Sequence, residues 1–563
     1  MQLWLDLHSP LPKKANDYGN RSSGETHGLV LTKPHIVDLI LDLAGYTADQ
    51  DLTKLRLLEP ACGEGAFLVR AVDRLMMAAR REGVQARTLL QAVAGFDIDQ
   101  EHVDETRSRI VQVLQGHRVH QATAQKLAEA WVQQGDFLMA KIVGDYDVVV
   151  GNPPYIRIEQ LPPVLQSEYR RRYSTLFDRA DIYVAFIERS LGLLSASGVL
   201  SFICADRWTL NKYGAPLRAL ITKSFAVHTY VDLHQASPFE SDVIAYPSIF
   251  VIGRERTERP AVVARMATAA PAECAAFQAM RAMGGPHVPG VSIAECATWF
   301  TGDDPWVLSS PEHLALLRTL EDRFQVLEGD GKTHVRIGVA TGCDRVLIVD
   351  EGADIEADRL LPLVMRADIE NGCIGNGRRF VINTYVQQGG VVDLAKFPRL
   401  ARYLNGHKAT LSKRHVAKQG DKWFRTIDRV YPELAARPKL LIPDIAGANE
   451  VVFEPGHYYP HHNLYFVISD NWDMEVLGGL LSSRVALFFV WSYAVKMRGG
   501  YLRFQAQYLR RIRVPDPSRM PGQLAAAIRG AFRARNFPRL DELACEAYCL
   551  KQLPQFDFVD TRT

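Results

Sequence analysis

Short apolar runs alternate with helical patterns of apolar residues along residues 28–255. Such alternation of strands with helices is typical of a parallel sheet that carries helices on both faces. The pattern therefore predicts an α/β domain with a Rossmann-like sheet over 28–255. We expect its strands at residues 55–58, 93–96, 146–150, 199–203 and 248–252, and two of its helices at 66–80 and 181–194.

The pattern changes after residue 255. Residues 256–300 contain Ala- and Pro-rich stretches and are interpreted as a connector. Strand-like runs alternate with turns over 301–515, which predicts a separate mixed α+β domain with strands near 335–339, 346–349, 439–442 and 464–467. Residues 1–27 are treated as an N-terminal segment, and 516–563 are expected to form a helical tail.

Composition is that of a soluble globular protein of two or three domains, with 563 residues, 47% of them hydrophobic and 23% charged. The first residues lack a basic segment followed by an apolar one, so secretion is not expected. The longest apolar stretch, 485–495, is too short to span a membrane. The eight cysteines show no metal-ligand spacing, which fits a reducing cytoplasm.

The net charge of +2 does not by itself indicate a polyanionic partner. Basic residues nevertheless outnumber acidic ones by ten to two between Lys396 and Arg429, and by six to none between Lys496 and Arg513. Aromatic residues lie among them, which suits phosphate contact and base stacking, although a solvated face shows the same pattern. The candidates for nucleic-acid contact are Lys413, Arg414, Lys422, Arg498, Arg503 and Arg510.

Asn152-Pro153-Pro154-Tyr155 follows a β-branched run and Gly151. The prolines lack N–H donors, so the loop carbonyls remain available as acceptors, and the fixed φ keeps the loop out of helix. If the Asn152 side-chain oxygen and the Pro153 carbonyl both accept from one NH2 group, its nitrogen becomes more nucleophilic. Tyr155 can then stack on the ring that carries it. The motif predicts a site for a flat amino-bearing group, with a simple proline turn as the alternative.

A candidate cofactor loop joins the first strand to the first long helix. Glycines here allow the backbone to approach a ligand closely, while the dinucleotide spacing and the phosphate-loop lysine are both missing. Asp97, followed by Ile98, ends the second strand and can accept both ribose hydroxyls. Asp136 and Phe137 can bind and cover an adenine ring. Together these features predict a nucleoside cofactor held by the loop with Gly63 and Gly65 and by Asp97, Asp136 and Phe137.

With these motifs in this order, the chain resembles the γ class of DNA adenine-N6 methyltransferases of restriction-modification systems, the TaqI-like group. The resemblance runs from about residue 28 to 255 and continues more weakly to 515. It implies a class I S-adenosylmethionine-dependent methyltransferase fold, S-adenosylmethionine as cofactor, and a target recognition domain at 301–515 that binds double-stranded DNA. The six basic candidates would then contact DNA.

The resemblance also implies roles for single residues. Thr32 matches the residue that closes over the methionine part of the cofactor, and Phe186 the aromatic residue of the pocket-lining helix. Glu59, Ala61 and Ile98 match further cofactor contacts. Asn152, Pro153, Pro154 and Tyr155 match the catalytic loop, and Asn152 is also expected to contact the cofactor. Tyr155 and Phe239 would stack on an adenine rotated out of the duplex, with Tyr246 as a competitor for the second position. No metal is expected, and the His461-His462 pair is interpreted as a structured turn because no carboxylate has supporting spacing.

Several alternatives share the same chemistry. An Asn-Pro-Pro-Tyr loop also suits cytosine-N4, RNA-base and protein-glutamine methylation, and a DNA-binding subunit without catalytic activity would be a different class. No Pro-Cys pair of the kind used by cytosine-C5 enzymes occurs. The family context implies a cytoplasmic monomer, with a separate restriction endonuclease as its counterpart, or a role in a related phage-defence system.

Overall fold

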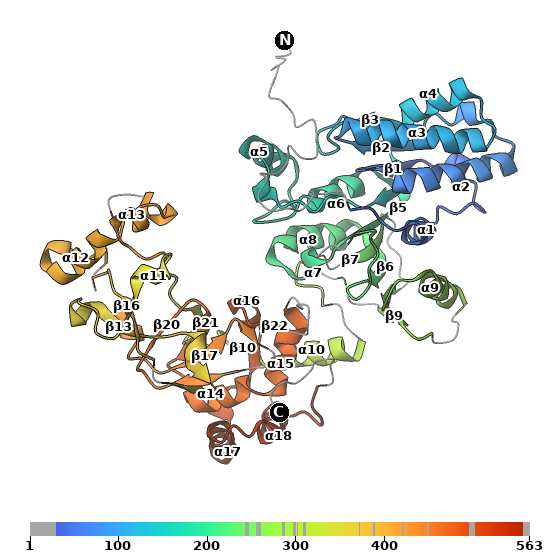
Figure 1. Ribbon diagram of the computed structural model, residues 1–563. Helices are drawn as coiled ribbons and strands as arrows, with labels where there is room; N and C mark the ends of the chain where they lie inside the picture. The colour runs from blue at the N-terminus through green and yellow to red at the C-terminus, as the bar shows by residue number, and fades with distance from the viewer. Residues whose placement is uncertain are drawn as a thin grey trace, which may run out of the picture. The chain divides into compact units, whose positions relative to one another are not determined.

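The computed structural model divides into an N-terminal unit, Met1–Leu308, and a C-terminal unit, Ser309–Thr563. Figure 1 shows the helices and strands of both units. The structure describes residues 30–142, 144–241, 247–254, 260–283, 288–296, 300, 302–307, 311–370, 372–375, 377–386, 389–418, 422–446, 450–494 and 502–554.

The N-terminal unit is built on a mixed sheet of nine strands within the described residues, in the order β3-β2-β1-β4-β5-β7-β6-β8-β9. The strands from β3 to β5 run parallel, β7 is antiparallel to both of its neighbours, and β9 is antiparallel to β8. The sheet is therefore mixed, which corrects the prediction of a parallel sheet. Strand bounds are β1 Leu57–Glu59, β2 Val93–Asp97, β3 Val132–Gln134, β4 Tyr146–Gly151, β5 Leu194–Ala205, β6 Ala226–Asp232, β7 Pro247–Gly253, β8 Ala261–Met266 and β9 Val291–Cys296.

Helices cover both faces of this sheet (Figure 1). Alternate residues of β4 enter different cores, since side chains along a strand point to opposite faces: Val148 and Val150 join one core and Val149 the other. The first core includes α1 Pro34–Leu43, α2 Ala66–Glu82, α3 Gln100–Gly116, α4 Gln121–Trp131 and α9 Pro271–Met283. The second includes α5 Pro163–Arg172, α6 Tyr183–Gly192, α7 Arg207–Leu210 and α8 Ala215–Ser224.

The stretch expected to be a connector, 256–300, contributes two strands and a helix to this unit. Strand β8 pairs with β6 in parallel, and β9 extends the edge of the sheet. Helix α9 buries Cys274, Phe277 and Met280 in the first core. The Ala-rich composition therefore belongs to a packed helix, since Ala has the highest helix propensity and needs little room.

The C-terminal unit contains two four-stranded sheets, in the orders β11-β21-β17-β19 and β12-β16-β13-β20, and shorter ladders within the described residues. The predicted strand at 346–349 is a short helix that runs into β12. The strand bounds are β10 Gln325–Val326, β11 Thr333–Ile337, β12 Ile348–Asp350, β13 Leu360–Val364, β14 Ile369–Glu370, β15 Cys373–Ile374, β16 Arg379–Ile382, β17 Lys439–Pro443, β18 Ile445–Ala446, β19 Val452–Glu454, β20 Tyr459–Pro460, β21 Leu464–Ser469, β22 Leu502–Arg503 and β23 Arg513–Val514.

Helices of the C-terminal unit pack beside these sheets, and the final two pack against α14 rather than standing apart as a tail. The helix bounds are α10 Pro311–Arg323, α11 Asp344–Leu347, α12 Pro398–Gly406, α13 Lys408–Leu411, α14 Met474–Leu481, α15 Arg484–Tyr493, α16 Ala506–Leu509, α17 Gly522–Arg533 and α18 Phe537–Ala547. A fully buried ion pair joins Lys439 of β17 to Glu454 of β19.

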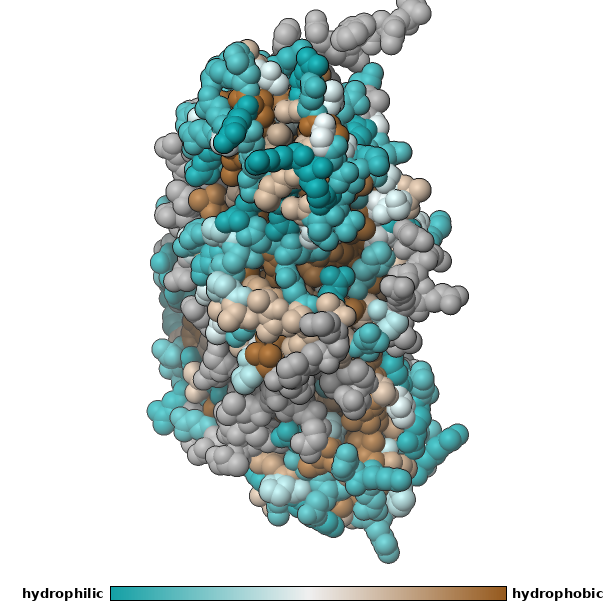
Figure 2. All heavy atoms as spheres, turned by 90° about the vertical axis from the view of Figure 1, so that its right-hand side faces the viewer, coloured by the Kyte–Doolittle hydropathy of each residue, from teal (hydrophilic) through white to brown (hydrophobic). Residues whose placement is uncertain are grey.

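Hydrophilic side chains cover most of the face drawn in Figure 2, with hydrophobic side chains in smaller patches between them. Among the residues that the structure describes, no single helix has the length and apolar content needed to cross a membrane. The bent pair formed by α14 and α15 meets that test by length and composition when the two are taken together.

Candidate functional site

A pocket of about 940 Å³, counted with the solvent at its mouth, lies in the N-terminal unit where β1, β2 and β4 end. Open α/β sheets bind their ligands at this edge. The sequence-predicted residues that line it are Thr32, Glu59, Ala61, Gly63, Asp97, Ile98, Asp136, Phe137, Asn152, Pro154 and Phe186.

The loop after β1 is held by Asp97 at the end of β2. The Gly63 N–H donates to Asp97 Oδ2 at 2.9 Å, and the Asp99 N–H donates to Oδ1, also at 2.9 Å. His102, in the first turn of α3, lies 3.3 Å from Oδ1, and this hydrogen bond raises the pKa of the imidazole. Oδ2 accepts only the Gly63 N–H among these bonds and so retains a lone pair. Asp97 can therefore hold the loop and still accept from a ligand.

Gly65 does not line the pocket, and its role is conformational. Its φ is +84°, a left-handed value that glycine adopts readily and other residues rarely do. A Cβ atom here would lie 2.9 Å from the Thr106 side chain on α3. Gly65 therefore starts α2 and allows α2 and α3 to approach each other.

Glu59 at the end of β1 is a buried carboxylate with an unsatisfied atom. Its side chain is 1% exposed, and Oε2 has no hydrogen-bond partner within the described chain. Burial, and then the charge of Asp97, raise its pKa well above the usual range. A buried polar atom of this kind has a free-energy cost that a ligand donor would remove.

Asp136 and Phe137 form the opposite wall of the pocket. Asp136 accepts from the Leu138 N–H at 2.8 Å and from the Tyr169 hydroxyl at 2.7 Å. Phe137 stacks on Phe186 of α6, with ring centroids 5.3 Å apart and 28° between the planes. This wall offers a flat apolar surface beside a carboxylate, an arrangement that suits a purine ring with an amino group.

The side-chain amide of Asn152 has a fixed orientation, because its nitrogen has hydrogen-bond partners and its oxygen has none within the described chain. Its Nδ2 donates to the Val30 carbonyl at 2.9 Å and lies 3.4 Å from Thr32 Oγ1. The Val30 carbonyl can only accept a hydrogen bond, so the amide nitrogen must face it. Its Oδ1 is buried and has no partner in the described part of the chain. One strong acceptor is thus left free beside the pocket.

Tyr155 and Phe239 lie next to each other but not in a stacking arrangement. Their ring centroids are 6.4 Å apart and their planes meet at 73°, an edge-to-face contact. A base between two stacking rings needs them roughly parallel, about 7 Å apart, so one ring must turn to admit it. Phe239 is buried and forms a β-bridge with Thr32, which ties its loop to the segment before α1. Tyr246 lies outside the described residues.

Some residues of the site were not predicted, and some predicted ones stand outside the pocket. Pro153, Tyr155 and Phe239 do not line it, while Pro154 does. Tyr169 reaches Asp136 from a helix 33 residues away, and no local pattern could have indicated that contact. His102 could have been found, because it lies one turn after the strand-end Asp97. The further lining residues are Val30, Leu31, Pro60, Cys62, Ala66, Phe67, His102, Gly135, Ile156, Tyr169 and Ile182.

The six basic candidates of the C-terminal unit fall into three groups. Lys413 and Lys422 are exposed, whereas Arg498 lies outside the described residues. Arg503 pairs with Asp444, and Arg510 pairs with Glu328 at 2.9 Å. These ion pairs favour a structural role for both arginines.

Arg414 also has a structural role, because it binds backbone carbonyls. Its guanidinium donates to the carbonyls of Leu411, Thr341, Trp423 and Arg425 at 2.9–3.1 Å. Such a network holds loops together and leaves few donors for a phosphate.

Comparison with known proteins gives consistent results. A family model described as Eco57I restriction-modification methylase matches residues 51–239. Type II methyltransferase M.PaeR7I of Pseudomonas aeruginosa is 45% identical over 93% of this chain and 92% of its own. Type II methyltransferase M.BstVI of Geobacillus stearothermophilus is 43% identical over 93% of this chain and 96% of its own.

Among solved structures, the Type IIL restriction-modification enzyme MmeI in complex with DNA aligns with 93% of this chain and 75% of its own. The TM-score is 0.61 at 13% identity. This likeness concerns the fold and agrees with the predicted combination of an α/β sheet with a C-terminal mixed domain. The identity to curated relatives over nearly the whole length goes further: the chain belongs to the Type II DNA methyltransferases of restriction-modification systems.

Proposed function

We propose that this DNA methyltransferase transfers a methyl group from S-adenosylmethionine to the N6 amino group of an adenine rotated out of double-stranded DNA. The observation that carries the proposal is the free Asn152 Oδ1, buried with no partner while Nδ2 is held by the Val30 carbonyl. A rigid acceptor without a donor suits an exocyclic amino group, because each N–H needs an acceptor in a site that excludes water.

The loop supplies more than one acceptor. Asn152 is followed by two prolines, so the next two peptide nitrogens carry no hydrogen. The Pro153 carbonyl is the natural second acceptor, and Tyr155 provides a ring for the base. Two hydrogen bonds accepted from one NH2 group draw its lone pair away from the ring and toward the methyl donor. The residues thus orient and activate the amino group without a strong base.

The pocket fits S-adenosylmethionine better than a phosphate-bearing cofactor. Asp97 lines it with a carboxylate, and the buried Glu59 adds an oxygen, Oε2, that lacks a partner within the described chain. The ammonium and sulfonium groups of S-adenosylmethionine are cations, whereas the phosphates of NAD or ATP would be repelled. Asp97 would hold the ribose, Asp136 and Phe137 the adenine, and Thr32 the methionine part. When bound, this cofactor supplies an electrophilic methyl group.

A covalent cysteine mechanism does not suit the site. Cys62 lines the pocket but is buried, and burial raises the pKa of its thiol well above the usual range. The thiolate is the nucleophilic form, so a thiol of this kind is unreactive. Direct attack by the base nitrogen therefore agrees better with the residues present.

The test is to identify the methylated base. The full chain would be incubated with tritiated S-adenosylmethionine and unmethylated bacterial DNA, which is then digested to nucleosides. We expect the label in N6-methyladenine. Label in N4-methylcytosine would retain the role of Asn152 and overturn the choice of base. Absence of label in DNA, with cofactor binding shown by calorimetry, would overturn the proposal.

Double-stranded DNA would be positioned by exposed cations of the C-terminal unit, Lys413 and Lys422. Each phosphate contact contributes about 0.9 to the slope of log affinity against log salt concentration. We expect Lys413→Ala/Lys422→Ala to lower that slope by about 2, as measured by fluorescence anisotropy. Arg519→Ala, which removes a cation with 87% of its side chain exposed, is the control and should leave the slope unchanged. An unchanged slope in the double variant would exclude both lysines as phosphate contacts.

A further inference from the structure

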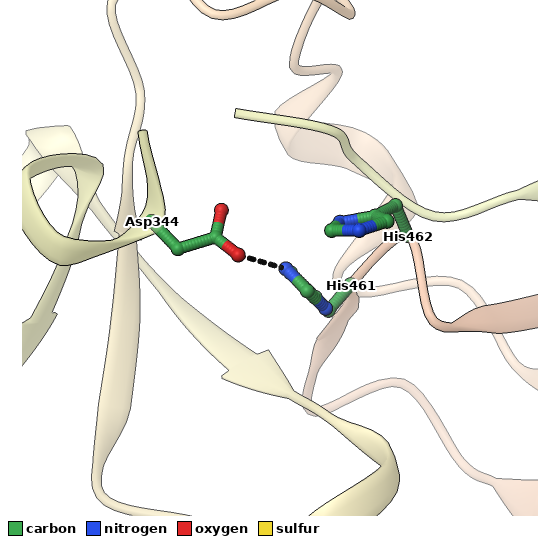
Figure 3. Close-up of side chains that lie close together, drawn as sticks. All are labelled: Asp344, His461 and His462. Atoms are coloured by element: carbon green, nitrogen blue, oxygen red, sulfur yellow. Dashed lines mark hydrogen bonds and ion pairs between the residues drawn. The ribbon is translucent and has the colours of Figure 1, made fainter. Parts of the chain in front are cut away.

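The C-terminal unit brings three metal-ligand residue types together away from the methyltransferase pocket. Asp344 starts the short helix α11, and His461 and His462 follow β20. One ligand atom from each lies within 4.8 Å of the others. Figure 3 shows the three side chains converging from two segments, with the Asp344 carboxylate facing His461 and the His462 ring beside it. Asp344 Oδ2 and His461 Nε2 are 3.1 Å apart.

Neighbouring groups hold the Asp344 carboxylate and the backbone of both histidines. The buried Thr341 hydroxyl donates to Asp344 Oδ1, which leaves Oδ2 directed at His461. Carboxylate ligands of metal ions are typically oriented by such neighbouring hydrogen bonds. His461 forms a β-bridge with Val339, and the His462 N–H donates to the Val339 carbonyl at 3.1 Å. The fold therefore places both histidines beside Asp344.

The two histidine rings lie side by side. His461 is 3% exposed, and the centroid of its ring is 4.0 Å from that of His462. One nitrogen of each ring can therefore reach the same ion beside the Asp344 carboxylate.

The sequence-based expectation of a simple turn rested on the absence of a carboxylate at supporting spacing. The structure corrects that premise, because Asp344 reaches His461 across 117 residues of chain. Metal ligands need proximity in space, and the pairing of segments that supplies it here is not encoded in local spacing.

We propose that Asp344, His461 and His462 bind one divalent transition-metal ion. Two imidazoles and one carboxylate favour zinc, cobalt or nickel over magnesium and calcium, which prefer sites made of oxygen ligands. Three protein ligands leave room for water in the remaining positions. The ion would cross-link α11 to the turn before β21, and would raise the thermal stability of the C-terminal unit. A hydrogen-bonded Asp344–His461 pair without metal is the alternative outcome.

The experiment uses the full chain without a histidine tag, stripped of metal with a chelator and then titrated with zinc. We expect one high-affinity site and a higher thermal midpoint with zinc present. His462→Ala removes an exposed ligand and should weaken binding by at least about 10–100-fold. Asp344→Asn should weaken it while it retains an oxygen acceptor facing His461. Cobalt substitution should give visible absorption bands that both variants lose.

His415→Ala is the matched control, since His415 is an exposed histidine of the same unit. It should bind zinc like the unaltered chain. Failure of the unaltered chain to bind zinc would overturn the proposal. Equal binding by His462→Ala and the unaltered chain would also overturn it, because zinc held by cysteines elsewhere would survive that change. Circular dichroism of each variant separates loss of the site from loss of the fold.

Discussion

Glu59 in the N-terminal unit and Glu454 in the C-terminal unit are both fully buried carboxylates, but their surroundings differ. Glu454 pairs with Lys439 and also accepts from the Gly456 N–H at 3.0 Å and the His457 N–H at 2.5 Å. Glu59 has one oxygen with no partner within the described chain. All the hydrogen-bond partners of Glu454 come from the fold itself, whereas Glu59 keeps an oxygen that a ligand could bind.

The difference separates structural from functional polar groups. An unsatisfied buried atom lowers stability, so its presence beside a pocket indicates a ligand that completes it. Asn152 Oδ1 is a second such atom in the same unit. In the C-terminal unit, three of the arginines expected to contact DNA, Arg414, Arg503 and Arg510, bind carboxylates or carbonyls of their own chain. A basic run in the sequence therefore does not distinguish a cation that binds DNA from one that holds a loop.

The largest effect is expected from Glu454→Gln. It leaves Lys439 buried and without its charge partner, and breaking a buried ion pair on one side costs about 3–5 kcal/mol. The thermal midpoint of the C-terminal unit should fall sharply, while cofactor affinity of the N-terminal unit is retained. Arg402→Ala is the control, because it breaks an ion pair whose side chains are 77% and 67% exposed and should cost at most about 1 kcal/mol. Equal effects of the two changes would contradict the distinction.

Asn152→Ala tests the role of a buried polar group that the fold leaves without a partner beside the pocket. Removing one preorganised hydrogen-bonding group from a reaction centre lowers turnover by about 10²–10³-fold. We expect a loss of this size in single-turnover methylation, with cofactor affinity by calorimetry little changed. Asn405→Ala, which removes an exposed amide on α12, should methylate normally. Full activity of Asn152→Ala would remove the assigned role of the amide.

The sequence indicated part of the pocket lining where the motifs are local. Glu59, Ala61 and Gly63 belong to one contiguous loop and Asn152 and Pro154 to another, and all five line the pocket. The antiparallel direction of β7 was not predictable, because a fully buried strand has the same apolar run in either direction. Strand β9 is only partly buried at the sheet edge, and its weak apolar signal led to the connector interpretation.

Contacts between segments that are distant in the chain could not be predicted from the sequence, for a different reason. The Tyr169–Asp136 hydrogen bond and the Asp344–His461 pair depend on which segments the fold brings together. The partners of Arg414 and Arg503 likewise depend on which segments the fold brings together. Residue type and spacing can indicate what a side chain is able to do, whereas its partner is fixed by tertiary structure.

Glu59→Gln sharpens the comparison between the two carboxylates. The raised pKa of Glu59 means that the folded chain favours its protonated form, so the ionised form makes the fold less stable as pH rises above the ordinary glutamate pKa. Glutamine carries no charge at any pH. We expect the thermal midpoint of this variant to match the unaltered chain in acid and to exceed it increasingly at higher pH.

The same change should weaken the binding of S-adenosylmethionine. Hydrogen bonds to charged groups contribute about 1.5–3 kcal/mol, which corresponds to roughly 10–100-fold in affinity. Calorimetry at neutral pH measures the affinity of the variant for S-adenosylmethionine. A variant that is less stable at high pH, or that binds the cofactor with unchanged affinity, would show that Glu59 is satisfied within the fold as Glu454 is.

The smallest effect concerns His102, whose hydrogen bond to Asp97 is the partly exposed counterpart of the buried Lys439–Glu454 pair. The side chains of His102 and Asp97 are 20% and 11% exposed. The bond to Asp97 raises the pKa of His102 in the folded chain. Its stabilising contribution is therefore complete below the unfolded pKa of about 6.5 and is lost as pH rises through the folded value.

His102→Gln should consequently lower the thermal midpoint of the N-terminal unit in mild acid and have little effect in mild alkali. The difference should be at most about 1 kcal/mol, because solvent screens the pair. His415→Gln, an exposed histidine in the other unit, should show no such pH dependence. If His102→Gln destabilised the chain equally at all pH values, the imidazole would act by packing rather than by charge. The contrast between a pH-sensitive pair at the pocket and a permanent pair in the C-terminal core would then not hold.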